Sequence, residues 1–246
     1  MFQIIFRGAH VVDPLNGRNG VFDVAVQDGK IAEVAPQIIG KTETEYDFSG
    51  KVLQPGIIDS HVHLGSMWGS FYGHRMLARS GVTTCLDMAG PLDDILDNIP
   101  EYGAGLNVAI LQFASPPFTF KTSSPTEAEM VDLIEKSLKD GAFGVKLLGG
   151  HYPLTPTVSS ELIQTALERG CYVAWHAGTT EHGSNIEGMV EAVDMAGSAP
   201  LHLAHINAYC RGAVRPELEE TKIAIDKLLA LMDVLLERQE NLVGVD

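Results

Sequence analysis

The sequence predicts an α/β protein, namely a (β/α)8-type TIM barrel that stops after six or seven strands and follows a small β domain. Two observations lead to this prediction. Residues 1–50 alternate apolar and polar side chains between glycine-rich turns, whereas from Lys51 onward short apolar runs, each followed by a helical pattern, recur about every 30 residues. The expected domains are residues 1–54 and residues 55–246.

The first domain is expected to contain a small antiparallel sheet. Asp28 and Gly29 lie between the runs FDVAV and KIAEV, and both runs keep a period of two. Because glycine tolerates a positive φ, this dipeptide is typical of a two-residue hairpin turn. The alternative is an ordinary loop at the same position.

The second domain is expected to be a parallel sheet covered by helices, because its strand candidates are apolar on both faces. These candidates are VLQPGIIDSHVHL, VTTCLDMA, LNVAILQFA, FGVKLLG, CYVAWHAG and PLHLAHINA, with NLVGV as a possible seventh. Helices are expected at 70–80, 125–140, 159–169 (opened by Ser159), 185–196 and 216–240. About 192 residues follow residue 54, whereas a complete barrel takes about 200–250, so two βα units are expected to be missing.

Charge and composition exclude several classes of partner. The chain has 17 Lys and Arg against 32 Asp and Glu, a net charge of −15, which repels nucleic acid and anionic lipid. The three cysteines, Cys85, Cys171 and Cys210, are widely spaced and predict reduced thiols in the cytoplasm. The sequence has no signal-peptide pattern and no apolar window approaching about 18 residues, so neither secretion nor a membrane span is expected.

Histidines occur at the ends of three strand candidates. His61 and His63 share one face of the first barrel strand, and His176 and His205 end two later strands. Catalytic residues of such barrels gather at the carboxyl ends of the strands, and neutral imidazole is a good ligand for zinc. We therefore expect the four rings to lie within about 8 Å of one another and to hold one or two divalent ions. His202, three residues before His205, is expected to face the other side of its strand in a packing or supporting role.

Lys146 lies inside the apolar run GVKLLGG. Burying an ammonium group is costly, and desolvation favours the neutral, nucleophilic amine. A packed stem whose head reaches a carboxylate is one interpretation. Together with the histidines, a role linked to metal is the preferred one.

The segments GAHVVDPLNG, VLQPGIIDSHVHL, FGVKLLGG, VAWHAG and LHLAHIN resemble the amidohydrolase superfamily of metal-dependent hydrolases in identity, order and spacing. The resemblance extends to about residue 215 and implies a composite β-sandwich beside the barrel. It implies that His61 and His63 hold the more buried metal and that His176 and His205 hold a second. It also implies that Lys146, carboxylated by carbon dioxide, bridges the two ions, with zinc as the expected metal.

The finer resemblance points to two groups of enzymes. A lysine on the fourth strand resembles dihydroorotases, dihydropyrimidinases and related cyclic amidases, whereas GGHYPLTPTVSSELIQTALERG and WHAGTTEHGSNIEGMVEAVDMA resemble N-acyl-amino-acid deacylases. Both groups hydrolyse an amide or imide C–N bond of a small molecule. The implied function is therefore hydrolysis of such a bond by a metal-activated hydroxide.

One family feature has no clear match. Members carry a general-base aspartate at the end of the eighth strand, and the candidate here is Asp246, which follows NLVGV. The chain is therefore expected to form a homo-oligomer or to be completed by a missing C-terminal segment. Alternatives are a truncated, non-catalytic metal-binding subunit or scaffold, and a mononuclear deaminase using His61, His63 and His176. Lys146 argues against the deaminase, because a single ion needs no bridging carbamate.

Overall fold

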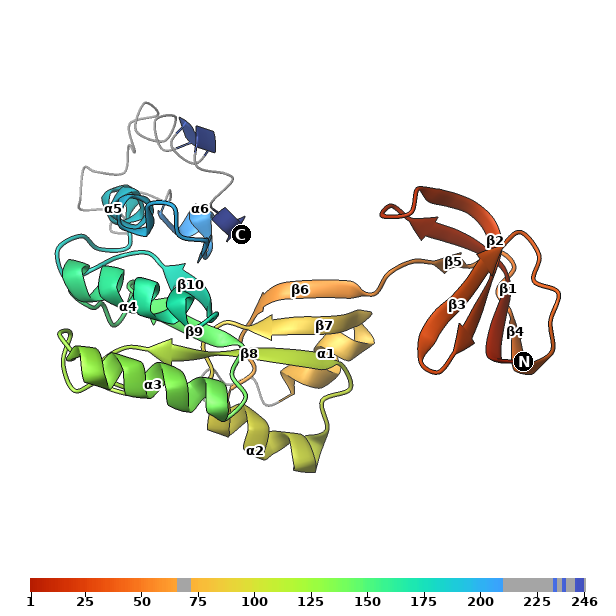
Figure 1. The fold of residues 1–246 in the computed structure, drawn as a ribbon, viewed down its shortest axis with the longest axis horizontal. Helices are drawn as coiled ribbons and strands as arrows, with labels where there is room; N and C mark the ends of the chain where they lie inside the picture. The colour runs from red at the N-terminus through yellow and green to blue at the C-terminus, as the bar shows by residue number, and fades with distance from the viewer. Residues whose placement is uncertain (66–71, 210–231, 234–235, 238–241, 246) are drawn as a thin grey trace. The chain divides into compact units, whose positions relative to one another are not determined.

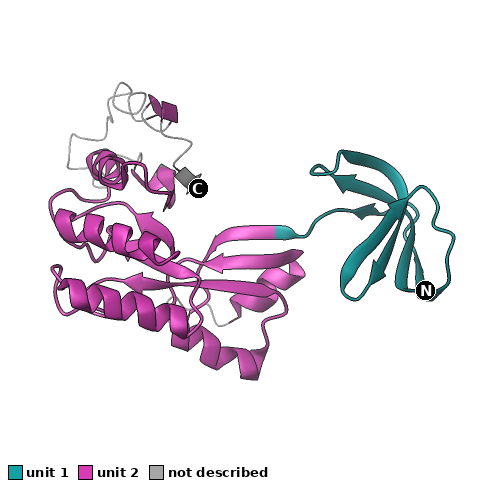
Figure 2. Cartoon of the chain, in the orientation of Figure 1, with its two compact units in different colours: residues 1–57 teal, residues 58–246 magenta. Residues whose placement is uncertain are grey.

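The computed structural model describes residues 1–65, 72–209, 232–233, 236–237 and 242–245. The chain divides into two compact units, residues 1–57 and residues 58–246, which Figure 2 shows in different colours. Each unit has its own sheet.

The first unit contains a five-stranded sheet in the order β3-β2-β1-β4, with β5 also paired to β1. The strands are β1 (Phe2–Asp13), β2 (Arg18–Gln27), β3 (Lys30–Ala35), β4 (Thr42–Asp47) and β5 (Val52–Leu53). The β1–β2 and β2–β3 pairs are antiparallel, as expected, but β4 and β5 pair with β1 in parallel. The sheet is mixed because β4 and β5 do not reach β1 through hairpins. The second layer of the expected sandwich stays a prediction.

The predicted hairpin between β2 and β3 is confirmed. Gln27 pairs with Lys30, so the loop contains only Asp28 and Gly29. Their φ angles are 53° and 71°, and positive values at both central residues suit the right-handed twist of the flanking strands.

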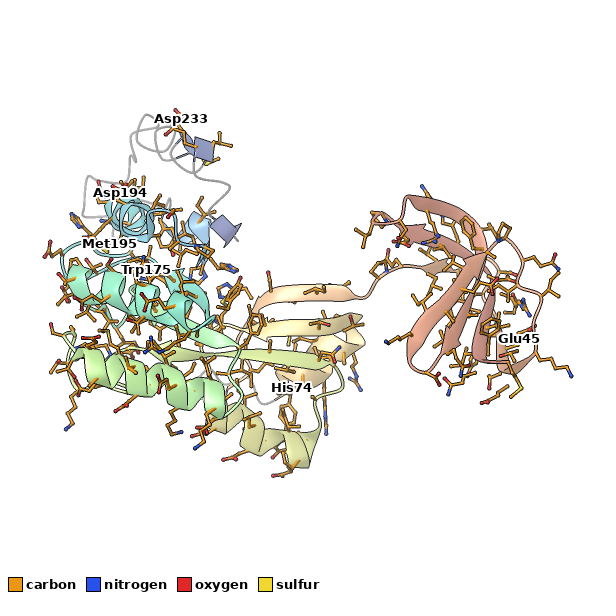
Figure 3. All side chains as sticks on the ribbon, viewed as in Figure 1. Glu45, His74, Trp175, Asp194, Met195 and Asp233 are labelled. Carbon is orange, nitrogen blue, oxygen red and sulfur yellow. The ribbon has the colours of Figure 1, made fainter. Side chains whose placement is uncertain are left out.

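A partly buried ion pair between Arg7 and Asp23 connects strands of the first unit. The Asp23 carboxylate accepts hydrogen bonds from Arg7 Nη1 at 2.7 Å and from the backbone N–H groups of Gly8 and Ile38 at 2.9 and 3.0 Å. Burial alone would raise the pKa of Asp23, but these hydrogen bonds outweigh it and lower the pKa. Arg7 also donates to Glu45 of β4 at 2.8 Å, and Figure 3 labels Glu45 on this unit. Through these contacts Arg7 of β1 is joined to Asp23 of β2 and to Glu45 of β4.

The second unit contains a sheet in the order β12-β11-β10-β9-β8-β7-β6. Figure 1 labels the strands β6 to β10 of this sheet. Its strands are β6 (Ile57–Val62), β7 (Val82–Asp87), β8 (Asn107–Ala114), β9 (Gly144–Leu148), β10 (Tyr172–His176), β11 (Leu201–Leu203) and β12 (Leu242–Val245). All neighbouring pairs from β7 to β12 are parallel. The six strand candidates are confirmed, NLVGV contributes the seventh, and the sheet fits an incomplete (β/α)8 barrel.

The helices follow the strands in the expected alternation. They are α1 (Gly73–Arg79), α2 (Leu92–Tyr102), α3 (Glu127–Lys139), α4 (Pro156–Glu168), α5 (Ile186–Ala196) and α6 (Ile206–Tyr209). In the described part of the chain, none is long and apolar enough to cross a membrane. Helix α2 is unexpected, since it contains Pro100. The helix expected at 216–240 lies mostly outside the described residues.

Helix α4 begins at Pro156, earlier than the expected start at Ser159. The Thr155 side chain caps it by accepting the Val158 N–H at 3.4 Å, and Pro156 occupies the first turn, where its missing N–H has no cost. Ser159 is instead a buried residue within the helix.

The two faces of β10 belong to different layers. Val173 and Trp175 belong to the large core cluster that the sheet forms with α3, α4 and α5, and Figure 3 labels Trp175 in this layer. Tyr172 and Ala174 belong instead to the inner cluster. Because side chains alternate along a strand, His176 lies on the inner face as well.

Candidate metal centre

The structure brings the four predicted histidines together. His61 is on β6, His63 follows that strand, His176 ends β10, and His205 lies just beyond β11. The ring centroids of His61 and His63 are 5.3 Å apart, those of His61 and His205 are 4.6 Å apart, and those of His176 and His205 are 4.5 Å apart. Three strand ends thus supply one continuous cluster of imidazoles.

The backbone at His205 has an unusual conformation. Strand β11 ends at Leu203, and His205 has a φ of 45°, in the left-handed region that non-glycine residues rarely occupy. In this conformation His205 Nε2 lies 2.5 Å from His176 Nδ1. Such strain often accompanies a functional position.

Tyr209 holds the two strand ends that carry His176 and His205. Its hydroxyl accepts the N–H of Ala177 at 2.8 Å and donates to the carbonyl of Ala204 at 2.6 Å. Ala177 follows His176 and Ala204 precedes His205 in the sequence, so one side chain fixes the spacing of both histidines. Sequence reasoning missed Tyr209, because no local motif marks a contact between two strand ends.

Lys146 lies on the inner face of β9. It is in register with Phe113 of β8 and Ala174 of β10, and only 1% of its surface is exposed. Its Nζ donates to Met88 Sδ at 3.8 Å. The sequence prediction of a buried lysine is therefore correct, whereas its carboxylation stays a prediction.

Two of the histidines have strongly lowered pKa values. Burial is the main cause for His63, followed by the charges of His61 and Lys146, and its pKa is about 4. Burial also dominates for His176, followed by Lys146, His151 and His61, and its pKa is again about 4. Both rings are therefore neutral near pH 7 and have a nitrogen lone pair available to a metal.

The prediction for His202 needs a correction. Its register partner on β10 is Ala174, and its Nδ1 lies 2.8 Å from the Tyr172 hydroxyl. His202 is therefore on the same sheet face as Lys146, although alternation was expected to separate it from the site. The alternation does not extend to His205, because the strand has ended and the backbone has turned.

Asp87 is a buried acid that sequence reasoning also missed, although its position within the apolar run VTTCLDMA is a signal. Its carboxylate accepts the backbone N–H groups of Leu64, Ala89 and Gly90 at 2.5, 3.0 and 2.6 Å. Burial raises its pKa, and these hydrogen bonds together with the charge of His61 oppose that shift. Asp87 therefore anchors the backbone directly after His63.

The side-chain types in this cluster suit a divalent ion better than the distances between their nitrogen atoms do. Within the described ranges, no three His, Cys, Asp or Glu side chains are arranged to hold one ion. His176 Nδ1 and His205 Nε2 share a hydrogen bond at 2.5 Å, whereas nitrogens bound to one zinc at about 2.0–2.1 Å stand farther apart. The neutral imidazoles of His63 and His176 are nevertheless the type of nitrogen ligand that zinc prefers. Asp246 lies outside the described residues.

The chain belongs to the amidohydrolase family, whose sequence profile matches residues 52–230. This assignment agrees with the parallel barrel sheet and with the histidines at its strand ends.

Two curated relatives show where the similarity lies. An allantoinase of Rubrobacter xylanophilus is 40% identical over 92 residues, which cover 35% of this chain and 20% of the allantoinase. A dihydroorotase of Geobacter metallireducens is 25% identical over 251 residues, which cover 87% of this chain and 57% of the dihydroorotase. The chain thus spans little more than half the length of the dihydroorotase.

A solved structure shows the same fold. The N-acyl-D-glutamate deacylase from Bordetella bronchiseptica, in complex with zinc and a phosphonate inhibitor, has a TM-score of 0.71 and 17% sequence identity. The match covers 99% of this chain and 58% of that chain.

Proposed function

We propose that this chain carries the metal site of a hydrolase that cleaves a non-peptide C–N bond, in an amide or a cyclic imide. The observation that carries the proposal is the contact of imidazole rings from three strand ends, beside a lysine that is 1% exposed. Membership of the amidohydrolase family and the similarity to an allantoinase and a dihydroorotase support the type of bond.

Each site residue has a proposed task. His61 and His63 would hold one divalent ion, His176 and His205 would hold a second, and carboxylated Lys146 would supply oxygen ligands to both. Zinc is the proposed metal. When bound, such ions lower the pKa of water to roughly 7 and polarise the carbonyl oxygen of the substrate. Burial keeps His63 and His176 neutral, which preserves their ability to bind metal at pH 7.

The proposed mechanism also needs a proton acceptor. The expected aspartate at the end of an eighth strand has Asp246 as its candidate, and that residue is outside the described part of the chain. General acid–base catalysis by this residue would contribute about 10²–10⁴-fold to the rate.

The first experiment combines metal analysis with turnover. We expect the purified chain to retain zinc by elemental analysis and to hydrolyse at least one member of a panel of cyclic imides and N-acyl amino acids. Removal of the metal with a chelator should abolish this activity. Retained zinc without turnover on any member, even after addition of a C-terminal extension, would contradict catalysis and support a non-catalytic subunit.

The role of Lys146 has its own test. Lys146→Ala should lose the second ion while keeping the one at His61 and His63, because the bridging group is gone. Excess bicarbonate should not restore the second ion, whereas a short carboxylic acid should. Lys139→Ala, at an exposed lysine of α3, is the matched control. Unchanged metal stoichiometry in Lys146→Ala would rule out the bridging role.

The edges of the barrel sheet support a second proposal, which concerns assembly. In the described sheet, β6 and β12 each pair with one neighbour, and Ile58 on β6 is 71% exposed. Open edges with apolar side chains favour pairing with another strand. We therefore propose that the chain forms a homo-oligomer or binds a completing segment. Light scattering should give a mass above that of one chain, and a monodisperse monomer would contradict this.

We propose a cytoplasmic location. Cys85 and Cys171 are buried free thiols, and burial raises the pKa of each to about 11. Both therefore stay in the unreactive thiol form, as suits a reducing compartment. Cys210 lies outside the described residues.

A further inference from the structure

Both ring nitrogens of His176 have hydrogen-bond partners. Nδ1 lies 2.5 Å from His205 Nε2, and Nε2 lies 2.6 Å from Ser184 Oγ. A neutral imidazole has one N–H and one lone pair, so the nitrogen that keeps the proton cannot bind a metal. The partner of Nε2 therefore decides whether Nδ1 is available to a metal.

We propose that Ser184 is a positioning residue, whose hydroxyl accepts the Nε2–H of His176 and keeps the Nδ1 lone pair directed toward His205. The proposal rests on the proposed function of the cluster as a metal site. Residues that bind the second nitrogen of a ligating histidine fix both its tautomer and its ring orientation. A flipped ring would present carbon instead of nitrogen to Ser184 and to His205, so both hydrogen bonds oppose the flip.

The loop that carries Ser184 is fixed by contacts that do not involve His176. The Thr179 hydroxyl donates to Glu191 of α5 at 2.8 Å and accepts the backbone N–H groups of Glu181 and His182 at 3.1 and 3.2 Å. His182 Nδ1 also lies 3.0 Å from the Glu191 carboxylate. Two contacts with Glu191, one from Thr179 and one from His182, therefore fix the part of the loop that precedes Ser184.

The far end of the loop is equally constrained. Asn185 directly follows Ser184 and caps α5 by accepting the Gly188 N–H at 2.9 Å. A Cβ at Gly188 would lie 2.1 Å from the Gly183 carbonyl oxygen, so loop and helix approach closely there. Contacts on both sides of Ser184 therefore fix the position of its hydroxyl independently of His176. The His176 ring orients toward this fixed hydroxyl.

Gly150 closes the same edge of the His176 ring. A Cβ at Gly150 would lie 2.2 Å from Nε2 and 2.6 Å from Cδ2 of that ring. The Nε2 edge is therefore occupied by the Gly150 backbone and the Ser184 hydroxyl, whereas Nδ1 faces another histidine. In this arrangement Nε2 would orient the ring, and Nδ1 would be the nitrogen that binds a metal.

Determining the tautomer of His176, in protein from which metal has been removed with a chelator, tests the proposal directly. In protein labelled with ¹⁵N-histidine, long-range ¹H–¹⁵N spectra distinguish a protonated Nε2 from a protonated Nδ1. We expect the Nε2–H form in the wild type and a mixture of both forms in Ser184→Ala. We also expect zinc affinity, measured by competition with a coloured chelator, to fall about 10–100-fold.

Three variants make the test specific. Ser184→Thr keeps the hydroxyl and should restore the wild-type tautomer, while Ser184→Cys keeps the bulk, has only a weak acceptor and should behave like Ser184→Ala. Thr180→Val, at an exposed position of the same loop, should change neither measurement. A wild-type spectrum and affinity in both Ser184→Ala and Ser184→Cys would overturn the proposal. Absence of zinc binding in the wild type would instead refute the proposed function, because the tautomer measurement needs no metal.

Discussion

A substitution at Gly150 would move one proposed ligand, His176, without changing its side chain. In Gly150→Ala the new Cβ would lie 2.2 Å from His176 Nε2, whereas ordinary contacts begin at 3.4 Å, so the ring must retreat by about 1.2 Å. The backbone at Gly150 does not have a positive φ, so the substitution acts through this contact. Metal–ligand distances tolerate about 0.2 Å, and zinc affinity should therefore fall about 10–100-fold.

The assay is zinc competition with a chromophoric chelator, combined with thermal unfolding. The His176 ring is the end of a side chain and can yield, so we expect the melting temperature to change by no more than about 4 °C. Gly183→Ala is the matched control, because a Cβ there meets nothing within 4 Å. Wild-type affinity in a folded Gly150→Ala protein would refute the reasoning and would remove His176 from the site.

Two further predictions concern charged pairs. Asp23→Ala leaves Arg7 partly buried without its main partner, so hydrogen exchange of β1 and β2 should show a loss of about 2–4 kcal/mol in unfolding free energy at pH 7. Because the folded pKa of Asp23 is lowered, its contribution is present above the unfolded value of 3.8, and the difference between variant and wild type should shrink as pH falls through the folded pKa. The hydrogen bond with Glu191 raises the pKa of His182, so the stability from this pair is complete below the unfolded value of 6.5 and is lost as pH rises through the folded pKa. The difference in melting temperature between Glu191→Gln and the wild type should therefore be larger at about pH 5.5 than at about pH 8.5. An equal difference at the two pH values would contradict this prediction.

The elements of the fold were predictable where local pattern decides them. Apolar runs identified the strands of the barrel sheet that the structure describes, and Asp28-Gly29 identified the β2–β3 hairpin of the first unit, because a turn of two residues depends on those residues alone. The parallel pairing of β4 with β1 was not predictable, since it joins segments that are distant in sequence. The start of α4 was missed because Thr155 and Ser159 are both acceptable caps, and the one followed by Pro156 is used.

The candidate site shows the same division. The histidines were found because each ends an apolar run, and their convergence follows from parallel strands. The face of His202 was predicted wrongly, because alternation cannot anticipate the positive φ of His205. Ser184, Tyr209 and Asp87 were missed, since their contacts with the site arise only from tertiary packing. The sequence thus indicates the candidate ligands, whereas the groups that hold them in place require the structure.

The central claim is that imidazoles from three strand ends form one metal centre, and anomalous diffraction at the zinc edge tests it most directly. In crystals of this chain grown with zinc, we expect one peak bonded to His61 and His63 and a second bonded to His176 and His205, about 3.5–4 Å apart. Zinc bound elsewhere, with no peak within bonding distance of any of these four rings, would contradict the claim.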